Sequence, residues 1–260
     1  MIRRLEEELE SLKSMKKYPK ELFYKGDLSL LNREKISIVG SRRPNQYARE
    51  LTHQLAVKLA QSGVCVVSGG AIGTDIIAHK AAGAQNTIMV AGTGLDKYYP
   101  AINKKVIQEI EKEGLVLSQF AEGTPSQRYN FPLRNELVVA LGEVLVVMYA
   151  DLNSGTMHSV EFALKMGKKV FVLPHRLGES EATNKLLQEN KAEAIYDIDA
   201  FVAKFSKKKQ KPKEEKADEF LEFCKTNPTY ESALKKFPGK VFEAELMGLI
   251  KIHNGLIYPI

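Results

Sequence analysis

The chain has 260 residues, of which 44% are hydrophobic and 27% are charged, and its formal net charge is +6. These values are ordinary for a globular protein, and no apolar run approaches the roughly 18 residues that a membrane-spanning helix requires. The two cysteines lie far apart, which excludes a disulfide framework and a zinc motif. We therefore expect a cytoplasmic protein, long enough for one large α/β domain and one small domain, that binds no metal and does not associate with a membrane.

The N-terminus is a strongly charged segment, MIRRLEEELESLKSMKK. It lacks the apolar region of a secretory signal and is typical of a short charged helix. We expect residues 1–32 to form a short charged extension that precedes an α/β domain over residues 33–206.

Short apolar runs rich in β-branched residues alternate with helix-length stretches from residue 35 onward. Continuous apolar runs are typical of strands that are covered on both faces of a parallel sheet. The strands are expected at 35–39, 64–67, 87–91, 115–118, 144–149 and 169–173, and the helices between them at 48–62, 74–83, 102–113 and 155–167. This alternation predicts a Rossmann-like, doubly wound, mostly parallel sheet, which binds ligands at the carboxyl ends of its strands.

Glycine-containing turns follow the first two of these strands. Ser41, Arg42 and Arg43 come after the strand at 35–39, and Gly69 and Gly70 come after the strand at 64–67. Backbone N–H groups in such turns can bind a phosphate, together with the N-terminus of the next helix, although the glycines could equally serve only to close a tight turn. The spacing is not GxGxxG and no acidic residue ends the strand at 87–91, so we expect no dinucleotide cofactor.

Cations and aromatic residues are mixed in the segment RYNFPLRN, residues 128–135, in a predicted loop that leads into a helix. Arg128 and Arg134 could bind phosphates, and Phe131 could stack on an unpaired base, as single-stranded nucleic acid requires. Pro132 favours an extended conformation for Phe131, and hence a side chain that projects from a loop. The alternative is that Phe131 fills the core and the arginines are ordinary surface residues.

Two further groups of polar residues lie at predicted helices. Ser154, Gly155 and Thr156 open a helix and form either a second phosphate site or an ordinary helix cap. Asp75 and His79 are four residues apart on one helix and could form an acid–base pair, although a structural, hydrogen-bonded pair is the simpler interpretation.

The C-terminal part of the chain is set apart by the segment KKKQKPKEEK, residues 207–216. Its six lysines and two glutamates carry +4, so the rest of the chain carries only +2, and the segment is predicted to be a solvated linker. Residues 217–260 show the spacing of three short helices, followed by a hairpin that turns at Asn254-Gly255. This order is the winged-helix pattern.

Taken in order, these motifs resemble the DprA/Smf family (DNA processing protein A). The resemblance covers about residues 18–203, and it is carried by Gly40-Ser41-Arg42, Ser68-Gly69 with Gly73 and Asp75, Gly94-Leu95-Asp96, Phe131-Pro132, Arg134-Asn135 and Ser154-Gly155. It implies an extended Rossmann fold, a homodimer, binding of single-stranded DNA during natural transformation, and delivery of that DNA to the RecA recombinase. Glu136 stands where the family usually has arginine, and His175 stands where glycine is usual.

Carried over to this chain, the resemblance implies a set of DNA-binding residues and no catalytic residue. Arg42 and Arg43 would hold phosphate, Arg128 would add a further cation, and Phe131 would stack or wedge against a base. The complete expected set is Ser41, Arg42, Arg43, Gly69, Gly70, Lys104, Lys105, Arg128, Phe131, Arg134, Asn135, Ser154, Gly155, Thr156 and Lys168. The dimer surface is expected around Leu186, Leu187, Ile195 and Phe201.

The main alternative is an enzyme, a nucleotide phosphoribohydrolase of the lysine-decarboxylase-like Rossmann group. Those enzymes show a PGGxGTxxE motif, whereas Ser154-Gly155-Thr156 lacks the preceding Pro-Gly-Gly, and Glu161 follows Thr156 by five residues instead of three. A regulator that binds duplex DNA through residues 217–260 is also disfavoured, because the second predicted helix there has only Lys235 and Lys236 as adjacent cations. We therefore expect a DNA-binding protein and not an enzyme.

Overall fold

The computed structural model describes residues 1–206, 219–246 and 250–259, so the predicted linker at 207–216 lies outside the described residues. The chain divides into two compact units, Met1–Lys207 and Lys208–Ile260, which are described separately.

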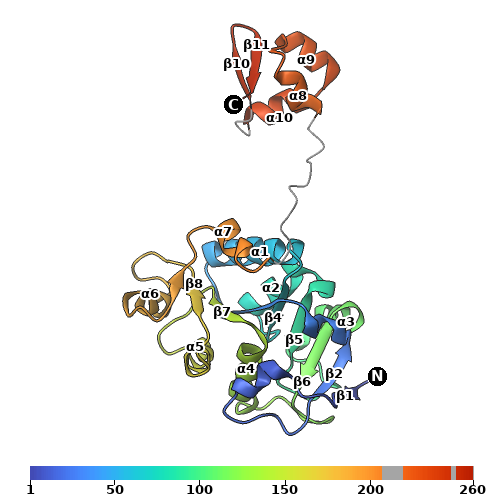
Figure 1. The fold of residues 1–260 in the computed structure, drawn as a ribbon, viewed down its shortest axis with the longest axis vertical. Coiled ribbons are helices and arrows are strands. Elements are labelled where there is room, and N and C mark those ends of the chain that lie inside the picture. The colour runs from blue at the N-terminus through green and yellow to red at the C-terminus, as the bar shows by residue number, and fades with distance from the viewer. Residues whose placement is uncertain (207–218, 247–249, 260) are drawn as a thin grey trace. The chain divides into compact units, whose positions relative to one another are not determined.

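A sheet of nine strands, counted over the described part of the first unit, organises that unit (Figure 1). The strand order is β1-β2-β6-β5-β4-β3-β7-β8-β9. All neighbours from β6 to β9 are parallel, whereas β1 and β2 are antiparallel to their partners. The strands are β1 Arg3–Arg4, β2 Phe23–Gly26, β3 Lys35–Val39, β4 Cys65–Ser68, β5 Thr87–Val90, β6 Leu115–Ser118, β7 Val144–Val147, β8 Val170–Val172 and β9 Glu193–Ala194. The predicted α/β fold class is confirmed, and all six predicted strands are present.

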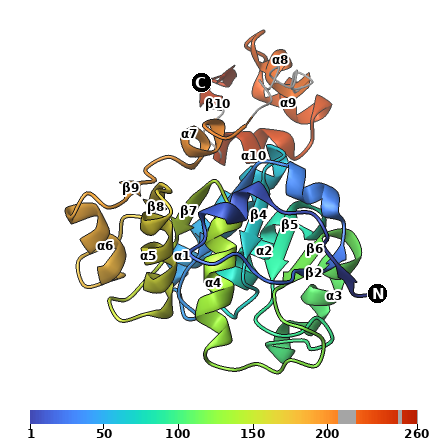
Figure 2. The same ribbon diagram turned by 60° about the horizontal axis from the view of Figure 1, so that its bottom comes forward.

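Helices cover both faces of this sheet (Figures 1 and 2). Successive residues of a strand point to opposite faces, so Ile36 and Ile38 of β3 pack on one side and Val39 on the other. The first side is covered by α1 Gln46–Gln61, α2 Thr74–Ala82 and α7 Ile198–Ala203, and the second by α4 Asn130–Leu141, α5 Gly155–Lys165 and α6 Glu181–Gln188. Helix α3, Lys104–Glu113, packs over β5 and β6.

The N-terminal segment is part of the sheet and not an extension ahead of it. Strand β2 pairs antiparallel with β6, with Tyr24 opposite Leu117, and so covers an edge that β6 would otherwise leave open. The expected helix is a short 3-10 turn, Glu10–Ser14, whose Leu12 is buried in the main core. A second 3-10 turn, Leu28–Asn32, buries Leu30 in the same cluster. The segment therefore belongs to the same unit as residues 33–206.

The residues expected at a dimer surface lie instead in the interior of the first unit. Leu186, Ile195 and Phe201 are only 3–5% exposed, and Leu187 is partly buried against the same core. Leu186 of α6 belongs to the main core cluster, and Phe201 of α7 packs onto Phe171 of β8, with ring centroids 5.0 Å apart. The burial of Leu186, Ile195 and Phe201 reflects packing within one chain and contradicts their prediction as dimer-surface residues, whereas the partly buried Leu187 stays a prediction.

The second unit has the predicted order of three helices and a hairpin. Its elements are α8 Glu219–Cys224, α9 Tyr230–Lys236, α10 Lys240–Leu246, β10 Ile250–His253 and β11 Leu256–Pro259. The hairpin turns at Asn254 and Gly255, which both have positive φ as a tight turn requires. Phe220, Cys224, Val241 and Ile257 form its core.

Candidate nucleic-acid interface

The predicted motifs converge at the carboxyl ends of the parallel strands. A cavity of about 380 Å³ is lined by the loop after β3, the first turns of α4 and the start of α5. A narrower cavity of about 70 Å³ adjoins it and is lined by the loops after β4 and β5. Four residues border both cavities, which therefore form one continuous groove; they are Arg42, Ala71, Phe131 and Arg134. We call the two cavities together the arginine groove.

Arg134 forms the floor of the arginine groove and is itself buried. Its Nη1 donates to the backbone oxygens of Gly69 and Val90, the latter at 2.9 Å, and its Nε donates to Oδ1 of Asn135 at 3.0 Å. Burial lowers the pKa of the guanidinium; Asp75 raises it, and nearby Arg42 lowers it. Arg134 and Asn135 therefore fix the shape and charge of the groove, and most of the donors of Arg134 are already used.

The glycines of the groove provide room for these side chains. A Cβ on Gly69 would overlap the Arg134 guanidinium, and a Cβ on Gly92 would lie 3.1 Å from the Phe131 ring. The backbone oxygen of Gly70 accepts a hydrogen bond of 3.0 Å from Nδ2 of Asn103. Both expected glycines, Gly69 and Gly70, are buried, so they shape the groove from beneath its surface.

Phe131 is half-buried and lines both cavities, but it does not project from a loop. Helix α4 already begins at Asn130, so Phe131 and Pro132 are its second and third residues. Proline is tolerated in the first turn of a helix, where its missing N–H needs no partner, and this outweighs the usual preference for an extended residue before proline. The prediction of an extended Phe131 is therefore wrong, although its partial exposure agrees with a binding role.

Two exposed arginines stand in the loop between β3 and α1. Arg42 lines both cavities, and the Arg43 backbone N–H donates to Oγ of Ser41 at 3.0 Å. Within the described ranges no salt bridge engages Arg42 or Arg43, nor Arg128, which is also exposed and lies just before α4. These guanidinium groups therefore remain available to phosphate oxygens.

The start of α5 forms the far wall of the groove. Ser154, Gly155 and Thr156 all line the larger cavity, and the N-terminus of an 11-residue helix carries partial positive charge. Oγ of Ser154 is enclosed and has no hydrogen-bond partner among the residues that the structure describes. This wall combines an unused hydroxyl with helix N–H groups, which is a chemistry suited to an anion.

Three expected lysines lie outside the groove lining. Nζ of Lys168 donates to the backbone oxygens of Ala140 and Gly142, just before β7, and so sits at the opposite end of the sheet. Burial lowers its pKa to about 8. Lys104 and Lys105 begin α3, near the carboxyl ends of the parallel strands. Nζ of Lys104 lies 5.3 Å from the centre of the Tyr98 ring. Lys168 therefore lies apart from the arginine groove, and its ammonium group caps carbonyl groups at the other edge of the sheet.

Asp75 and His79 have separate partners and do not act as a pair. Oδ2 of Asp75 accepts from the Ala71 backbone N–H at 3.4 Å, and burial raises its pKa although Arg134 opposes the rise. Nδ1 of His79 lies 2.6 Å from Oγ1 of Thr87. Oγ1 of Thr87 also lies 3.1 Å from the Val66 carbonyl oxygen, so Thr87 links the imidazole to β4. Burial lowers the His79 pKa to about 3.

Several residues that line the groove are absent from the set expected from the sequence, among them Tyr99 and Ile72. Tyr99 lies against Phe131, with ring centroids 5.5 Å apart, and Ile72 lines the narrow cavity. Its position could have indicated Tyr99 as a groove residue, because it lies in the loop after β5 and β5 is the neighbour of β4 in the sheet. Glu136, which replaces the usual arginine, is buried and accepts from the Lys16 backbone N–H at 3.0 Å. Its carboxylate thus anchors the N-terminal segment.

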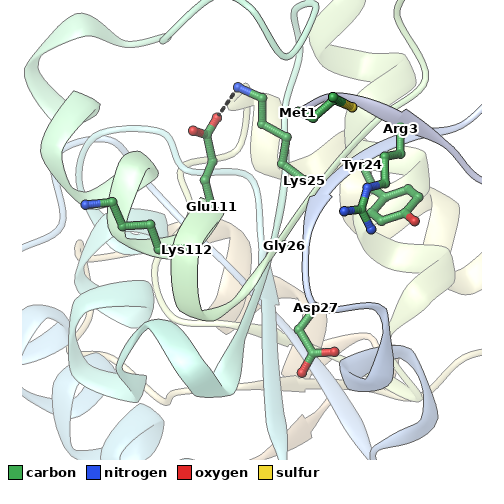
Figure 3. A pocket seen from close by; sticks show the side chains of 8 residues that line it. All are labelled: Met1, Arg3, Tyr24, Lys25, Gly26, Asp27, Glu111 and Lys112. Carbon is green, nitrogen blue, oxygen red and sulfur yellow. Dashed lines mark hydrogen bonds and ion pairs between the residues drawn. The ribbon is translucent and has the colours of Figure 1, made fainter.

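Another hollow, of about 530 Å³, lies beside β2 (Figure 3). An ion pair between Lys25 and Glu111, 2.9 Å long, forms part of its wall. Gly26 at its rim pairs with Leu115, the first residue of β6, so this hollow lies at the amino ends of the parallel strands. Ligands of such sheets bind at the opposite edge, which favours the arginine groove.

Comparisons with known proteins agree with these motifs. Residues 6–206 match the family described as DNA recombination-mediator protein A. The DNA processing protein DprA of Streptococcus pneumoniae is 37% identical over 176 residues, 66% of this chain and 62% of that protein. The DprA of Bacillus subtilis is 33% identical over 193 residues, 72% of this chain and 65% of that protein. The matched region thus spans less than two thirds of the length of either relative.

Solved structures give the same result. DNA processing protein A from Helicobacter pylori, whose structure is described as giving insight into its single-stranded DNA binding mode, is 42% identical with a TM-score of 0.77, over 78% of this chain and 95% of that chain. DprA from Streptococcus pneumoniae is 32% identical with a TM-score of 0.72, over 79% of this chain and 74% of that chain. The chain therefore belongs to the DNA recombination-mediator protein A family, the DprA/Smf family that its motifs resemble.

Proposed function

We propose that the protein binds single-stranded DNA without sequence specificity in the arginine groove. The observation that carries this proposal is the placement of Phe131, half-exposed between the buried Arg134 and the exposed Arg42. An aromatic face between cations can stack an unpaired base while arginines hold its phosphates. The single-stranded DNA binding described for the Helicobacter pylori relative supports the same conclusion.

The proposed cellular role is protection of internalised single-stranded DNA in the cytoplasm during natural transformation, and its delivery to the RecA recombinase. In this proposal the protein is a carrier and not an enzyme. In the part of the chain that the structure describes, no helix is long and apolar enough to cross a membrane.

We further propose that the protein is a homodimer, with a contact surface that differs from the one expected. Leu177 is 98% exposed and Tyr196 is 86% exposed. Each follows the carboxyl end of one of two neighbouring strands, β8 and β9, at one edge of the sheet. Two large apolar side chains exposed at one edge of the sheet suit a contact between two copies of the chain.

A mobility-shift experiment with single-stranded and duplex oligonucleotides of equal length, at two salt concentrations, tests the proposed function. Single strands should bind more tightly, and three phosphate contacts would weaken binding roughly 20-fold between 50 and 200 mM salt. Equal or tighter duplex binding would refute the proposal. A parallel assay for hydrolysis of nucleoside monophosphates tests the enzyme alternative, and turnover there would favour a phosphoribohydrolase.

A further inference from the structure

A second cavity, of about 560 Å³, lies on the same edge of the sheet as the arginine groove. We call it the Tyr47 pocket, and it is lined by Asn45, Gln46, Tyr47, Pro174, His175, Arg176 and Glu179. One continuous segment borders both sites: Gly40, Ser41 and Arg42 in the loop after β3 line the groove, and Asn45 with the first two residues of α1, Gln46 and Tyr47, lines the pocket. The opposite wall of the pocket is formed by residues that come after β8, and β8 lies two strands away from β3 in the sheet.

The distance between the two sites suits consecutive parts of one DNA strand. Adjacent strands of a sheet are about 4.8 Å apart, so the ends of β3 and β8 are separated by about 10 Å. A strand of DNA covers that distance with about three stacked nucleotides, at about 3.4 Å each, or with fewer when it is extended. Arg43 is exposed in the loop between the groove and the pocket, where it can meet the intervening phosphate.

The wall of the pocket is aromatic and rigid. Tyr47 is 44% exposed and lies edge-on to the His175 ring, with centroids 5.3 Å apart. Tyr149 contacts the same imidazole at 5.2 Å. Nε2 of His175 lies 2.9 Å from the Met148 carbonyl oxygen, which can only accept, so this nitrogen carries the proton. His175 therefore fixes the Tyr47 ring in place, which a glycine at position 175 could not do.

The charges of the lining favour a base over a phosphate. Arg176 and Glu179 are the only formally charged residues that line the pocket in the described part of the chain, and their charges cancel. Oε2 of Glu179 also accepts from Nδ2 of Asn45 at 3.0 Å, which occupies part of that carboxylate. What remains is a tyrosine ring, the apolar pyrrolidine ring of Pro174 and the amide of Gln46, which suit the flat face and polar edge of a nucleobase.

We propose that the Tyr47 pocket is a second base-binding site for the single strand that occupies the arginine groove. Tyr47 stacks on the base, Arg43 binds the phosphate between the two sites, and exposed Arg176 meets the phosphate beyond. This inference rests on the proposed function, because it requires a single strand in the groove. It extends the binding path along the strand ends toward β8.

Binding of oligothymidylates of two lengths, measured by fluorescence anisotropy, tests the inference. An oligomer of about 2 nucleotides fits in the groove alone, because it is shorter than the span of about 10 Å between the two sites, whereas one of about 12 nucleotides reaches both. Tyr47→Ala should weaken binding of the long oligomer about 5- to 150-fold and leave the short one unchanged. Tyr47→Phe should retain binding of both. Leu164→Ala, at a site of 41% exposure near the far end of α5, is the matched control and should change neither.

Arg176→Ala provides a second variant that disturbs no packing, because its side chain is exposed. It should weaken binding of the long oligomer alone and reduce its salt dependence. Unchanged binding of the long oligomer in both folded variants would overturn the inference, as would equal losses for the two lengths. A shift of either variant from dimer to monomer, with DNA affinity intact, would also overturn it and would assign the pocket to a second copy of the chain. If the unmodified protein bound neither oligomer, the proposed function itself would fail.

Discussion

Phe131 is held in a half-exposed position by contacts on two sides. The Tyr99 ring lies 5.5 Å from it, and the Arg134 guanidinium carbon lies 5.9 Å from its centre. Arg134 cannot move away, because its hydrogen bonds tie it to the loop after β4 and to the end of β5. Gly92 packs against the ring, and even a Cβ at this position would lie only 3.1 Å from it. At the scale of single residues, the groove is thus a preformed surface for stacking.

Replacement of Phe131 by alanine should lower the affinity for single-stranded DNA by about 1–3 kcal/mol, or about 5- to 150-fold, because a stacking face is lost. The salt dependence should stay nearly constant, since no ion pair is removed. The loss of folding stability should be smaller than the roughly 3–5 kcal/mol of a fully buried phenylalanine. Phe131→Leu is the control that keeps most of the packing without the aromatic face. Anisotropy and thermal melting of both variants check this, and a large stability loss with unchanged affinity would contradict it.

Replacement of both Arg42 and Arg43 by alanine should weaken binding about 10-fold or more. Both side chains are exposed, so the fold should be retained. The slope of log affinity against log salt should fall by about 1.4, because each phosphate contact with a single strand contributes about 0.7. Lys168→Ala is the matched control: it removes a cation from the other end of the sheet, so affinity should not change while the melting temperature falls. Salt titrations of the two variants separate these outcomes.

At the scale of elements, α2 is joined to the sheet by a buried neutral histidine. His79 on α2 is hydrogen-bonded to Thr87 at the start of β5, and the Thr87 hydroxyl also reaches the Val66 oxygen of β4. Burial disfavours the imidazolium form, so the folded-state pKa of about 3 lies below the ordinary value of 6.5. Between about pH 3 and pH 6.5, the unfolded chain therefore binds a proton at His79 more readily than the folded chain does.

This linkage predicts that stability contributed by neutral His79 is complete above about pH 6.5 and is lost as the pH falls toward 3. At pH 5 the loss should be about 2 kcal/mol, from about 1.4 kcal/mol per pH unit. His79→Gln, which can still donate to Thr87 but does not titrate, should flatten the stability curve in this range. His53→Gln on the exposed face of α1 should leave the curve unchanged. Urea unfolding at pH 7, 6 and 5 measures the difference, and an equal slope in all three proteins would disprove the assignment.

The elements that could be predicted from sequence are those with a strong local pattern. Continuous apolar runs identified β3 to β8, and Asn254-Gly255 identified the C-terminal hairpin. Strand β2 was missed because FYKG is not an apolar run and its pairing with β6 is a long-range contact. The start of α4 was missed because the effect of Pro132 depends on its position in the first turn.

In the candidate site too, local motifs could be predicted from the sequence, whereas long-range contacts could not. The rule that ligands bind at strand ends brought together the loops of Arg42, Phe131 and Ser154. It could not show that Arg134 is buried, because its partners at Gly69 and Val90 are 65 and 44 residues away in sequence. For the same reason it could not distinguish Lys168, which caps distant carbonyl groups, from a lysine that is free to bind DNA.

At the scale of the whole molecule, self-association depends on the apolar side chains that the fold leaves outside. Leu177→Glu combined with Tyr196→Lys should convert the proposed dimer into a monomer at micromolar concentration, because charges would replace the apolar contact. Leu186→Ala should instead destabilise the fold by about 2–5 kcal/mol, since its side chain is in the core. Light scattering and thermal melting distinguish the two effects. A dimer that persists in the folded double variant would place the contact elsewhere.

The pairing of β2 with β6 also affects how the chain acquires its structure on the ribosome. Strand β2 is synthesised early, but its partner is complete only at Ser118, roughly 90 residues later. At about 5–20 residues per second, that delay is about 5–20 s. Throughout this interval Leu12, Leu22 and Tyr24 lack the core that buries them in the finished protein. These side chains therefore stay without their final packing partners until β6, and after it α4, has been synthesised.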